Sequence, residues 1–151
     1  MMRLPPRIKI LEALSAIADG RIKLLGEKDA EVVSSDGTRT YRVYVDLGRR
    51  AAYSDDNGTV YRGYVGYPII SFLMARGVLP VDERLSQALK GIPWRKLNEQ
   101  YKRYDAVMEL VKAQLKDRGI SGDEVERYID AVMERLKGLG LRLERPIGQG
   151  K

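Results

Sequence analysis

The spacing of apolar residues changes twice along this chain, and these changes set the order of its secondary structure. Ile8, Leu11 and Leu14 recur every three or four residues, as in an amphipathic helix. From Arg21 onward apolar and polar residues tend to alternate, which is typical of half-buried strands. Helical spacing returns after Pro68. The sequence therefore predicts an α+β fold with an N-terminal helix, a central antiparallel sheet and C-terminal helices.

Turn motifs divide the middle of the chain into short strands. The Asp36-Gly37 pair predicts a hairpin, because this turn needs backbone angles that glycine tolerates. Residues 55–58, with the sequence Asp-Asp-Asn-Gly, predict a second hairpin. The expected strands begin near Ile22 and then cover residues 30–35, 41–47, 50–54 and 59–65. We therefore expect an antiparallel sheet of four or five strands.

The C-terminal half carries the longest periodic pattern in the chain. Short helices are expected over residues 68–77 and 82–90. Apolar residues then follow a heptad pattern from 97 to 115, which predicts one long helix. Ser121 and Glu124 match a capping box and open a last helix. We expect these two long helices to fold back on each other as an antiparallel hairpin.

The amino-acid composition excludes several kinds of chemistry. The chain contains no cysteine and no histidine, so it has no disulfide, thiolate nucleophile, imidazole catalyst or Cys/His zinc site. Asp46 with Asp55 and Asp56 could bind magnesium, but no other ligand accompanies them in the sequence. We therefore expect no enzyme activity, no catalytic residue, no metal and no cofactor.

The charge balance favours an anionic partner. Lys and Arg number 27 against 21 Asp and Glu, which gives a net charge of +6 and a pI near 9.5. Such an excess attracts nucleic acid, although a charged surface also serves solubility alone. The 32% of charged residues and the absence of cysteine resemble a heat-adapted protein. With no membrane-length apolar run and no secretory signal, the expected location is the cytoplasm.

The segment from Ser34 to Asp46 contains the pattern Ser-Ser-x-Gly followed by Tyr-x-Val, and an apolar helix is expected to begin at Ile69-Ile70. With this strand pattern and this helix in the same order, residues 30–79 resemble the SWIM-type zinc-finger domain. The resemblance implies a ββα-like core and a binding role, in DNA-linked processes or between proteins.

The resemblance places the four zinc ligands at positions that cannot bind zinc: Ala52, Ser54, Gly66 and Pro68. A structural zinc contributes about 10 kcal/mol or more to the folding of small fingers, so its loss requires a replacement. Four tyrosines fall near the expected metal position, and we expect them to pack together in its place. They are Tyr53, Tyr61, Tyr64 and Tyr67.

These patterns give a division of the chain. Residues 1–80 are expected to hold the first helix, the sheet and the SWIM-like region. Residues 81–140 are expected to form the helical region, packed with the rest as one globular unit. Residues 141–151, rich in glycine, are expected to be a flexible tail.

The exposed face of the sheet is the first candidate nucleic-acid site. Side chains alternate across strands, so Arg42 and Tyr44 share a face, as Arg62 and Tyr64 would on a nearby strand. Arginine grips phosphates and tyrosine stacks on bases. Two more arginines stand at the strand connection, namely Arg49 and Arg50. The alternative is Arg–Tyr packing that only covers the sheet.

The second candidate site is the basic and aromatic segment from Arg84 to Tyr104. Its expected nucleic-acid contacts are Trp94, Arg95, Lys96, Lys102 and Arg103. Arg95 and Lys102 are seven residues apart, as are Lys96 and Arg103, so they would form a stripe on one long helix. The alternative is a solvated helix face, with Tyr101 and Tyr104 in the core.

Residues 68–104 also permit a helix-turn-helix interpretation. The third helix would then present Arg95, Lys96 and Asn98 to a groove of DNA.

The sequence thus predicts a non-catalytic nucleic-acid-binding protein with low sequence specificity, contacting phosphates through Arg and Lys with aromatic stacking. The alternative is a protein-interaction module, or a small subunit of a larger assembly, that uses or self-associates through the helical hairpin. A second apolar stripe on the outer faces of the hairpin would favour this alternative.

Overall fold

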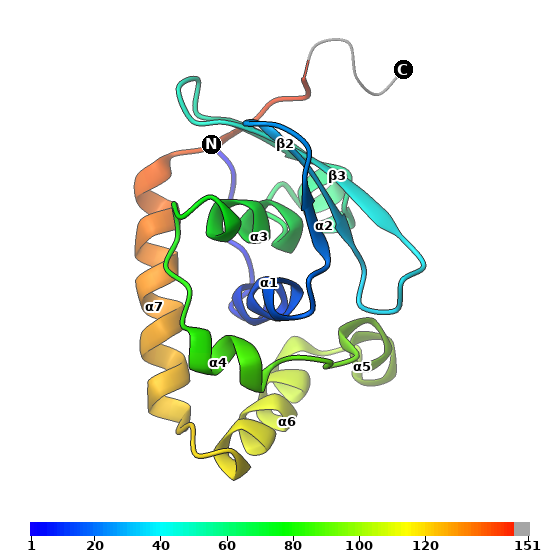
Figure 1. Cartoon of the computed structure of the whole chain (residues 1–151), viewed down its shortest axis with the longest axis vertical. Coiled ribbons are helices and arrows are strands. Elements are labelled where there is room, and N and C mark those ends of the chain that lie inside the picture. The colour runs from blue at the N-terminus through cyan, green and yellow to red at the C-terminus, as the bar shows by residue number, and fades with distance from the viewer. Residues whose placement is uncertain (147–151) are drawn as a thin grey trace.

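A computed structural model describes residues 1–146 of the chain, with the elements labelled in Figure 1. The helices are α1 (Ile8–Ala18), α2 (Asn57–Arg62), α3 (Tyr67–Ala75), α4 (Glu83–Ala88), α5 (Trp94–Tyr101), α6 (Tyr104–Asp117) and α7 (Gly122–Leu139). The strands are β1 (Ile22–Leu24), β2 (Asp29–Val33), β3 (Thr40–Asp46), β4 (Ala51–Ser54) and β5 (Arg142–Leu143). The predicted α+β class, with an N-terminal helix and C-terminal helices, is confirmed.

The sheet has the order β1-β2-β3-β4-β5. The first four strands pair antiparallel with their sequence neighbours, and β5 adds to β4 in parallel. The predicted Asp36-Gly37 turn joins β2 to β3, with Gly37 at a φ of 75°. Alternate residues such as Val32 and Val43 are buried against the helices, as the alternation predicts.

The fifth strand is not the one that the sequence predicted. Residues 57–62 form helix α2, because the Asp56 side chain accepts a hydrogen bond from the Thr59 N–H and caps a helix. The fifth strand comes instead from Arg142–Leu143, within the expected flexible tail. Leu141 is buried beside it, so residues 141–143 belong to the fold. Residues 147–151 of that expected tail lie outside the described part.

The single long helix expected over 97–115 is also wrong. The helix is interrupted at Lys102, whose left-handed backbone (φ 59°) ends α5. Arg103 is extended, and α6 begins after it. Tyr101 and Tyr104 flank this break with exposed fractions of 40% and 42%, so neither is a core residue. The break lets α5 turn toward the sheet, where the Arg95 N–H donates to Ser35 Oγ at 3.0 Å.

Helix α1 lies at the centre of the molecule, with α3, α4, α7 and the sheet arranged around it (Figure 1). Leu11 and Leu14 have no exposed surface. Two buried hydroxyls join α1 to the α4 region: Ser15 Oγ donates to the Leu89 carbonyl, and Ser86 Oγ donates to the Leu14 carbonyl. Central packing of this helix gives the fold one continuous core.

Helices α6 and α7 follow each other as the predicted helical hairpin. The capping box is confirmed, because the Glu124 N–H donates to Ser121 Oγ at 3.2 Å. Lys112 of α6 donates a hydrogen bond to the Glu126 carboxylate of α7, which also forms a salt bridge with Arg7. No helix within residues 1–146 is long and apolar enough to cross a membrane.

Two glycines provide a matched test of packing. A Cβ at Gly66 would lie 2.2 Å from Asp56 Oδ2, whereas a Cβ at Gly138, inside α7, meets nothing within 4 Å. We expect Gly66→Ala to lower the free energy of unfolding by about 1–3 kcal/mol through overpacking. Gly138→Ala should raise it by about 0.5–1 kcal/mol, since alanine favours the helix. Urea denaturation of both variants checks this. An unchanged midpoint for Gly66→Ala would contradict the close approach.

Candidate functional site

The basic and aromatic residues picked out from the sequence do not form the two surfaces expected of them. Arg62 lies in helix α2, and Tyr64 follows it in a short bridge with Arg3. Neither belongs to the sheet, so neither shares a face with Arg42 and Tyr44. This correction follows directly from the replacement of the predicted 59–65 strand by a helix.

The residues expected on the outer face of the sheet have neighbours within the protein. Arg42 pairs in register with Glu31, and Tyr44 pairs with Tyr53. The Arg145 guanidinium lies 5.2 Å from the centre of the Tyr53 ring and donates to its hydroxyl. The sheet face therefore carries mixed charge and its own aromatic contact.

Arg49 and Arg50 hold the end of the described chain. The Arg49 side chain pairs with Glu144. The Arg50 carbonyl accepts a 2.7 Å hydrogen bond from the Arg142 N–H, beside β5. Both residues thus have structural contacts that the sequence did not indicate.

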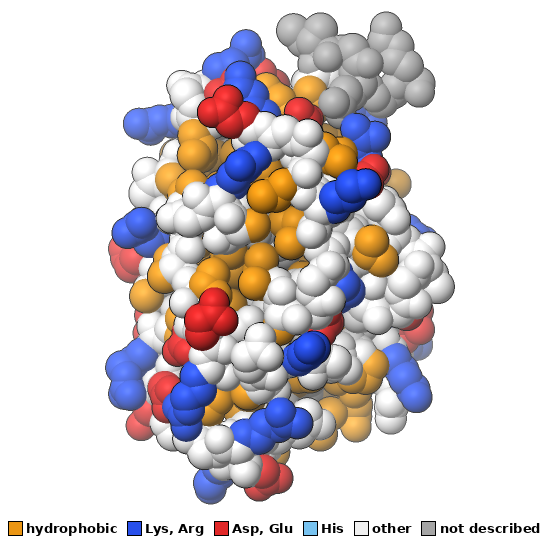
Figure 2. Space-filling model, in the orientation of Figure 1, with side chains coloured by type: hydrophobic (Ala, Val, Ile, Leu, Met, Phe, Trp, Pro, Cys, Tyr) orange, Lys and Arg blue, Asp and Glu red, His pale blue; other side chains and the backbone are white. Residues whose placement is uncertain are grey.

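The expected basic stripe over residues 95–103 is divided by the break between α5 and α6. Lys96 is exposed on α5, Lys102 is the left-handed residue of the break, and Arg103 pairs with Asp105 at 2.8 Å. Figure 2 shows Lys, Arg, Asp and Glu side chains intermixed on the face that it presents, with no large basic patch. Charge on that face is therefore balanced locally.

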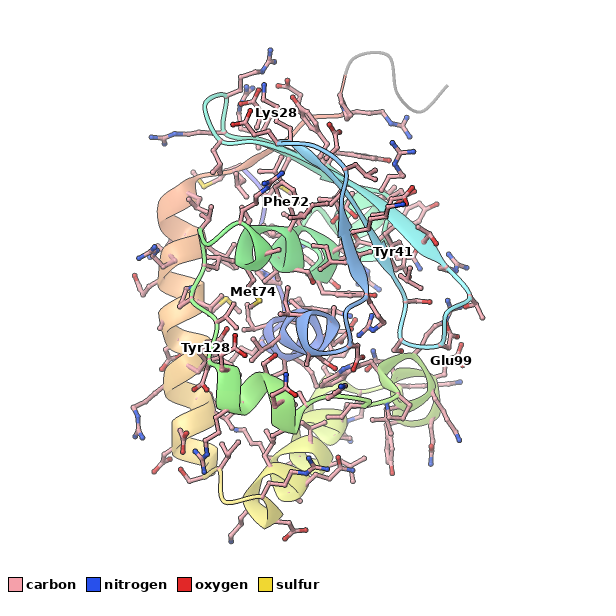
Figure 3. The ribbon with its side chains drawn as sticks, in the orientation of Figure 1. Lys28, Tyr41, Phe72, Met74, Glu99 and Tyr128 are labelled. Carbon is pink, nitrogen blue, oxygen red and sulfur yellow. The ribbon has the colours of Figure 1, made fainter. Side chains whose placement is uncertain are left out.

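Tyr64, Trp94 and Arg95 do come together, at a pocket between α1, α5 and the sheet. Its volume is about 190 Å³. Its lining residues come from α1, β3, α2, α3, α5, α6 and the segments that connect these elements. They are Lys9, Glu12, Arg21, Ser34, Ser35, Tyr41, Asp56, Asn57, Gly58, Tyr64, Tyr67, Trp94, Arg95, Asn98 and Tyr104. In Figure 3, Tyr41 and Glu99 mark the side of the molecule where the sheet approaches α5.

An ion pair on helix α1 forms the base of the pocket. Lys9 Nζ and Glu12 Oε2 are 3.1 Å apart, and their side chains are only 12% and 4% exposed. Lys9 also lies 4.9 Å from the centre of the Tyr104 ring. Burial lowers the pKa of Lys9, but the Glu12 carboxylate together with Tyr104 and Tyr64 raises it by more, so the pKa is raised overall. Lys9 is therefore a fixed positive charge at neutral pH.

Asp56 and the loop after it form a second wall. Thr59 donates to the two Asp56 oxygens from its N–H at 3.1 Å and from its hydroxyl at 2.8 Å. Gly66 packs against the same carboxylate, and Gly58 lies so close to the Tyr64 ring that a Cβ would stand 2.3 Å from it. Burial raises the pKa of Asp56, against the lowering by Thr59.

Aromatic rings line much of the remaining surface. Tyr41 and Tyr67 meet edge to face, with ring centres 6.0 Å apart and planes at 83°. Burial raises the pKa of Tyr41, Tyr64 and Tyr67, so their hydroxyls stay protonated at neutral pH. Trp94 is 2% exposed and closes the α5 side. The pocket thus combines aromatic walls with charged groups of both signs.

Two surface grooves adjoin the pocket. The first shares Asn57, Gly58, Tyr64 and Tyr104 with it and adds residues of the N-terminal segment and α2: Arg3, Leu4, Pro5, Pro6, Tyr61 and Arg62. The second shares Tyr41, Asn57, Arg95 and Asn98 and adds Arg39 and Glu99. Asn57 borders all three hollows. The pocket and the two grooves therefore adjoin one another, and together we call them the channel.

The metal and tyrosine arrangements considered for the sequence do not form. Asp46 pairs with Lys28, Asp55 accepts from the Arg42 N–H, and Asp56 lines the pocket. No group of three potential metal ligands occurs within residues 1–146. The expected tyrosine cluster is also wrong: Tyr61 is 78% exposed and Tyr53 lies under Arg145, so only Tyr64 and Tyr67 share a site.

Sequence reasoning missed most of the polar residues of the pocket. Lys9 and Glu12 were detectable, because two charges three residues apart interrupt an otherwise apolar helix face. Arg21 and Asn57 carry no local signal, and Asn98 was considered only as a groove contact of a helix-turn-helix, since only the fold brings these residues to the pocket.

The fold and site define an α+β protein with a polar pocket on its central helix. Residues 2–142 match the family described as Uncharacterised conserved protein UCP014422, and the chain belongs to that family. No curated protein and no solved structure matches the chain.

Asp36 fixes the position of Arg95 at the mouth of the pocket and gives a pH test. Its Oδ1 accepts hydrogen bonds from Thr38 and Ser34, and its Oδ2 lies 3.4 Å from Arg95 Nε. Hydrogen bonds from Thr38, then Ser34, lower the pKa of Asp36 from 3.8 to about 2. Because the folded state favours the charged form, its stabilising effect is complete above pH 3.8 and is lost as the pH falls through 2.

We therefore expect Asp36→Asn to lower the free energy of unfolding at pH 7, and the difference from wild type to shrink between pH 4 and pH 2. Urea denaturation at pH 7, 4 and 2.5 measures it. Asp117→Asn, at an exposed carboxylate on the end of α6, is the control. A difference independent of pH would show that the Asp36 charge does not contribute.

Proposed function

We propose that this protein binds nucleic acid without catalysing a reaction, gripping phosphates through arginines and stacking bases on aromatic rings. The observation that carries the proposal is the channel formed by the pocket and its two grooves. Arg3 and Arg62 border one groove, and Arg39 and Arg95 border the other. Arginine forks suit phosphate oxygens, and tyrosine rings along the same path suit bases.

The electrostatics of the channel support an anionic ligand. Among the described residues, the two grooves are bordered by Arg3, Arg62, Arg39 and Arg95 against the single acid Glu99. Arg95 is paired with Asp36, and inside the pocket Lys9 pairs with Glu12 and Arg21 with Asp19. Positive charge along a cleft raises the local concentration of anions. The groove arginines that have no acidic partner in the described chain therefore favour a phosphate backbone along the grooves.

The proposed contact surface is narrower than the sequence indicated. It keeps Arg62, Tyr64, Trp94 and Arg95, and it leaves out the sheet face together with Lys96, Lys102 and Arg103. Low sequence specificity remains part of the proposal, since phosphate contacts carry no base information. The proposal also places the protein in the cytoplasm.

A protein-interaction role through the helical hairpin has less support. Val107, Val111 and Leu115 of α6 face the core, as do the apolar residues of α7. In the described chain, exposed α7 positions include Arg127, Asp130, Glu134 and other polar residues, with no second apolar stripe. The SWIM resemblance suits either role, and β3, β4 and α3 occur in the order that it implies, with helix α2 between β4 and α3.

The proposal predicts salt-dependent binding to a labelled single strand, measured by fluorescence anisotropy. The logarithm of the affinity should fall linearly with the logarithm of the salt concentration, by about 0.7 per phosphate contacted. Arg62→Ala and Arg95→Ala should each weaken binding and reduce this slope by one such contact. Arg127→Ala is the matched control, because α7 contributes no residue to the channel.

DNA and RNA strands and duplex DNA are compared in the same series. Absence of binding to all three at low salt would refute the proposed function. Equal weakening by Arg127→Ala would mean that overall charge, and not the channel, attracts the nucleic acid.

A further inference from the structure

Three buried polar atoms around the pocket lack protein partners. The Trp94 indole N–H, one Arg21 guanidinium nitrogen and the Asn98 side-chain oxygen find no hydrogen-bond partner within residues 1–146. Buried polar groups are almost always paired in folded proteins. Trp94 forms part of the pocket wall and is only 2% exposed. Two donors and one acceptor among the residues that line the pocket are therefore without a protein partner in the described part of the chain.

The remaining bonds of these side chains hold them in place. Asn98 Nδ2 donates toward Glu12 Oε2 at 3.4 Å, which leaves the amide oxygen free. Arg21 donates to Asp19 and to the Val33 carbonyl, which leaves its other terminal nitrogen free. Rigid groups of this kind select ligands by the pattern of donors and acceptors.

The size of the pocket limits what can enter it. Its 190 Å³ exceeds the roughly 150 Å³ cavity that holds benzene. It is smaller than the roughly 300–1,000 Å³ typical of drug-sized ligands. One planar ring system with polar edges fits these limits, and Tyr41, Tyr64, Tyr67 and Tyr104 offer aromatic surface for it.

The two grooves indicate what kind of molecule carries the group that enters the pocket. Asn57 borders the pocket and both grooves, so a chain lying along the grooves passes the pocket mouth. Arg62 borders the first groove, and Arg95 borders the second groove and the pocket itself. A group that enters the pocket from such a chain would have anionic links on both sides of it.

We propose that the pocket receives one unstacked nucleobase from a single strand whose backbone lies along the two grooves. This inference rests on the proposed function and specifies that the nucleic acid is single-stranded. Base edges offer both donors and acceptors, which are the kinds of partner that the Trp94, Arg21 and Asn98 groups lack within residues 1–146. Single strands can splay such a base out, whereas a paired base would first have to leave its duplex.

The experiment separates the base from the backbone. One labelled 12-nucleotide strand is abasic throughout, and a second is identical except for one central base. Both carry the same phosphates, so the ratio of their affinities isolates the contribution of the base. We expect the single base to raise the affinity by about fivefold or more, as one base–aromatic stack does. Anisotropy at fixed salt measures both strands.

Two tyrosines of similar exposure provide the matched variants. Tyr104 lines the pocket, whereas Tyr101, three residues earlier, lines neither the pocket nor either groove. Tyr104→Ala should reduce the base-dependent ratio toward one, and Tyr101→Ala should leave it unchanged. Trp94→Phe keeps a ring but removes the free N–H, so it should also lower the ratio.

Each other outcome overturns the inference in a distinct way. Salt-dependent binding of both strands with a ratio of one would leave the proposed function intact and refute the base pocket. Failure of both strands, together with natural DNA and RNA, would refute the proposed function as well. If a free nucleoside monophosphate binds as tightly as the single-base strand, the pocket serves a mononucleotide and not a strand.

Discussion

The buried ion pair on the central helix is the constraint on which the site depends. Moving a charge out of water costs several kcal/mol, and Lys9 and Glu12 lie on a helix that is otherwise enclosed by apolar packing. The fold meets this cost by surrounding the pair with polar partners: Asn98 reaches Glu12, and the Tyr104 ring lies beside Lys9. Consequently the core opens into a polar pocket on this side of α1.

Close backbone approaches then give the pocket its shape. Gly66 lets the start of α3 contact the Asp56 carboxylate, and Gly58 lets α2 contact the Tyr64 ring. Thr59 links these elements, because its hydroxyl donates to Asp56 and accepts from the Gly66 N–H. The loop around α2 is thus a well-bonded wall, and a side chain at either glycine would have to displace it.

Local signals predicted the elements, whereas the site depends on contacts between distant residues. The Asp36-Gly37 turn and the Ser121 cap were predictable because each motif satisfies its own backbone. Residues 55–58 were predicted to form a hairpin turn but instead begin helix α2, because the residue types that form turns also cap helices. The break at Lys102 has no glycine to announce it, and the two-residue strand β5 is too short for alternation to detect. Trp94 was recognised by type, but its burial beside α1 was not predictable.

The arrangement of ion pairs matters more here than the net charge of +6. Arg49, Arg84 and Arg103 each pair with an acid, so they add little field beyond their own contact. Arg39 and Arg62 have no ion pair within residues 1–146, and both border the grooves that lead to the pocket. Unpaired cations therefore remain along a path that also holds aromatic rings. A strand of nucleic acid meets both requirements, because its phosphates and bases alternate along one chain.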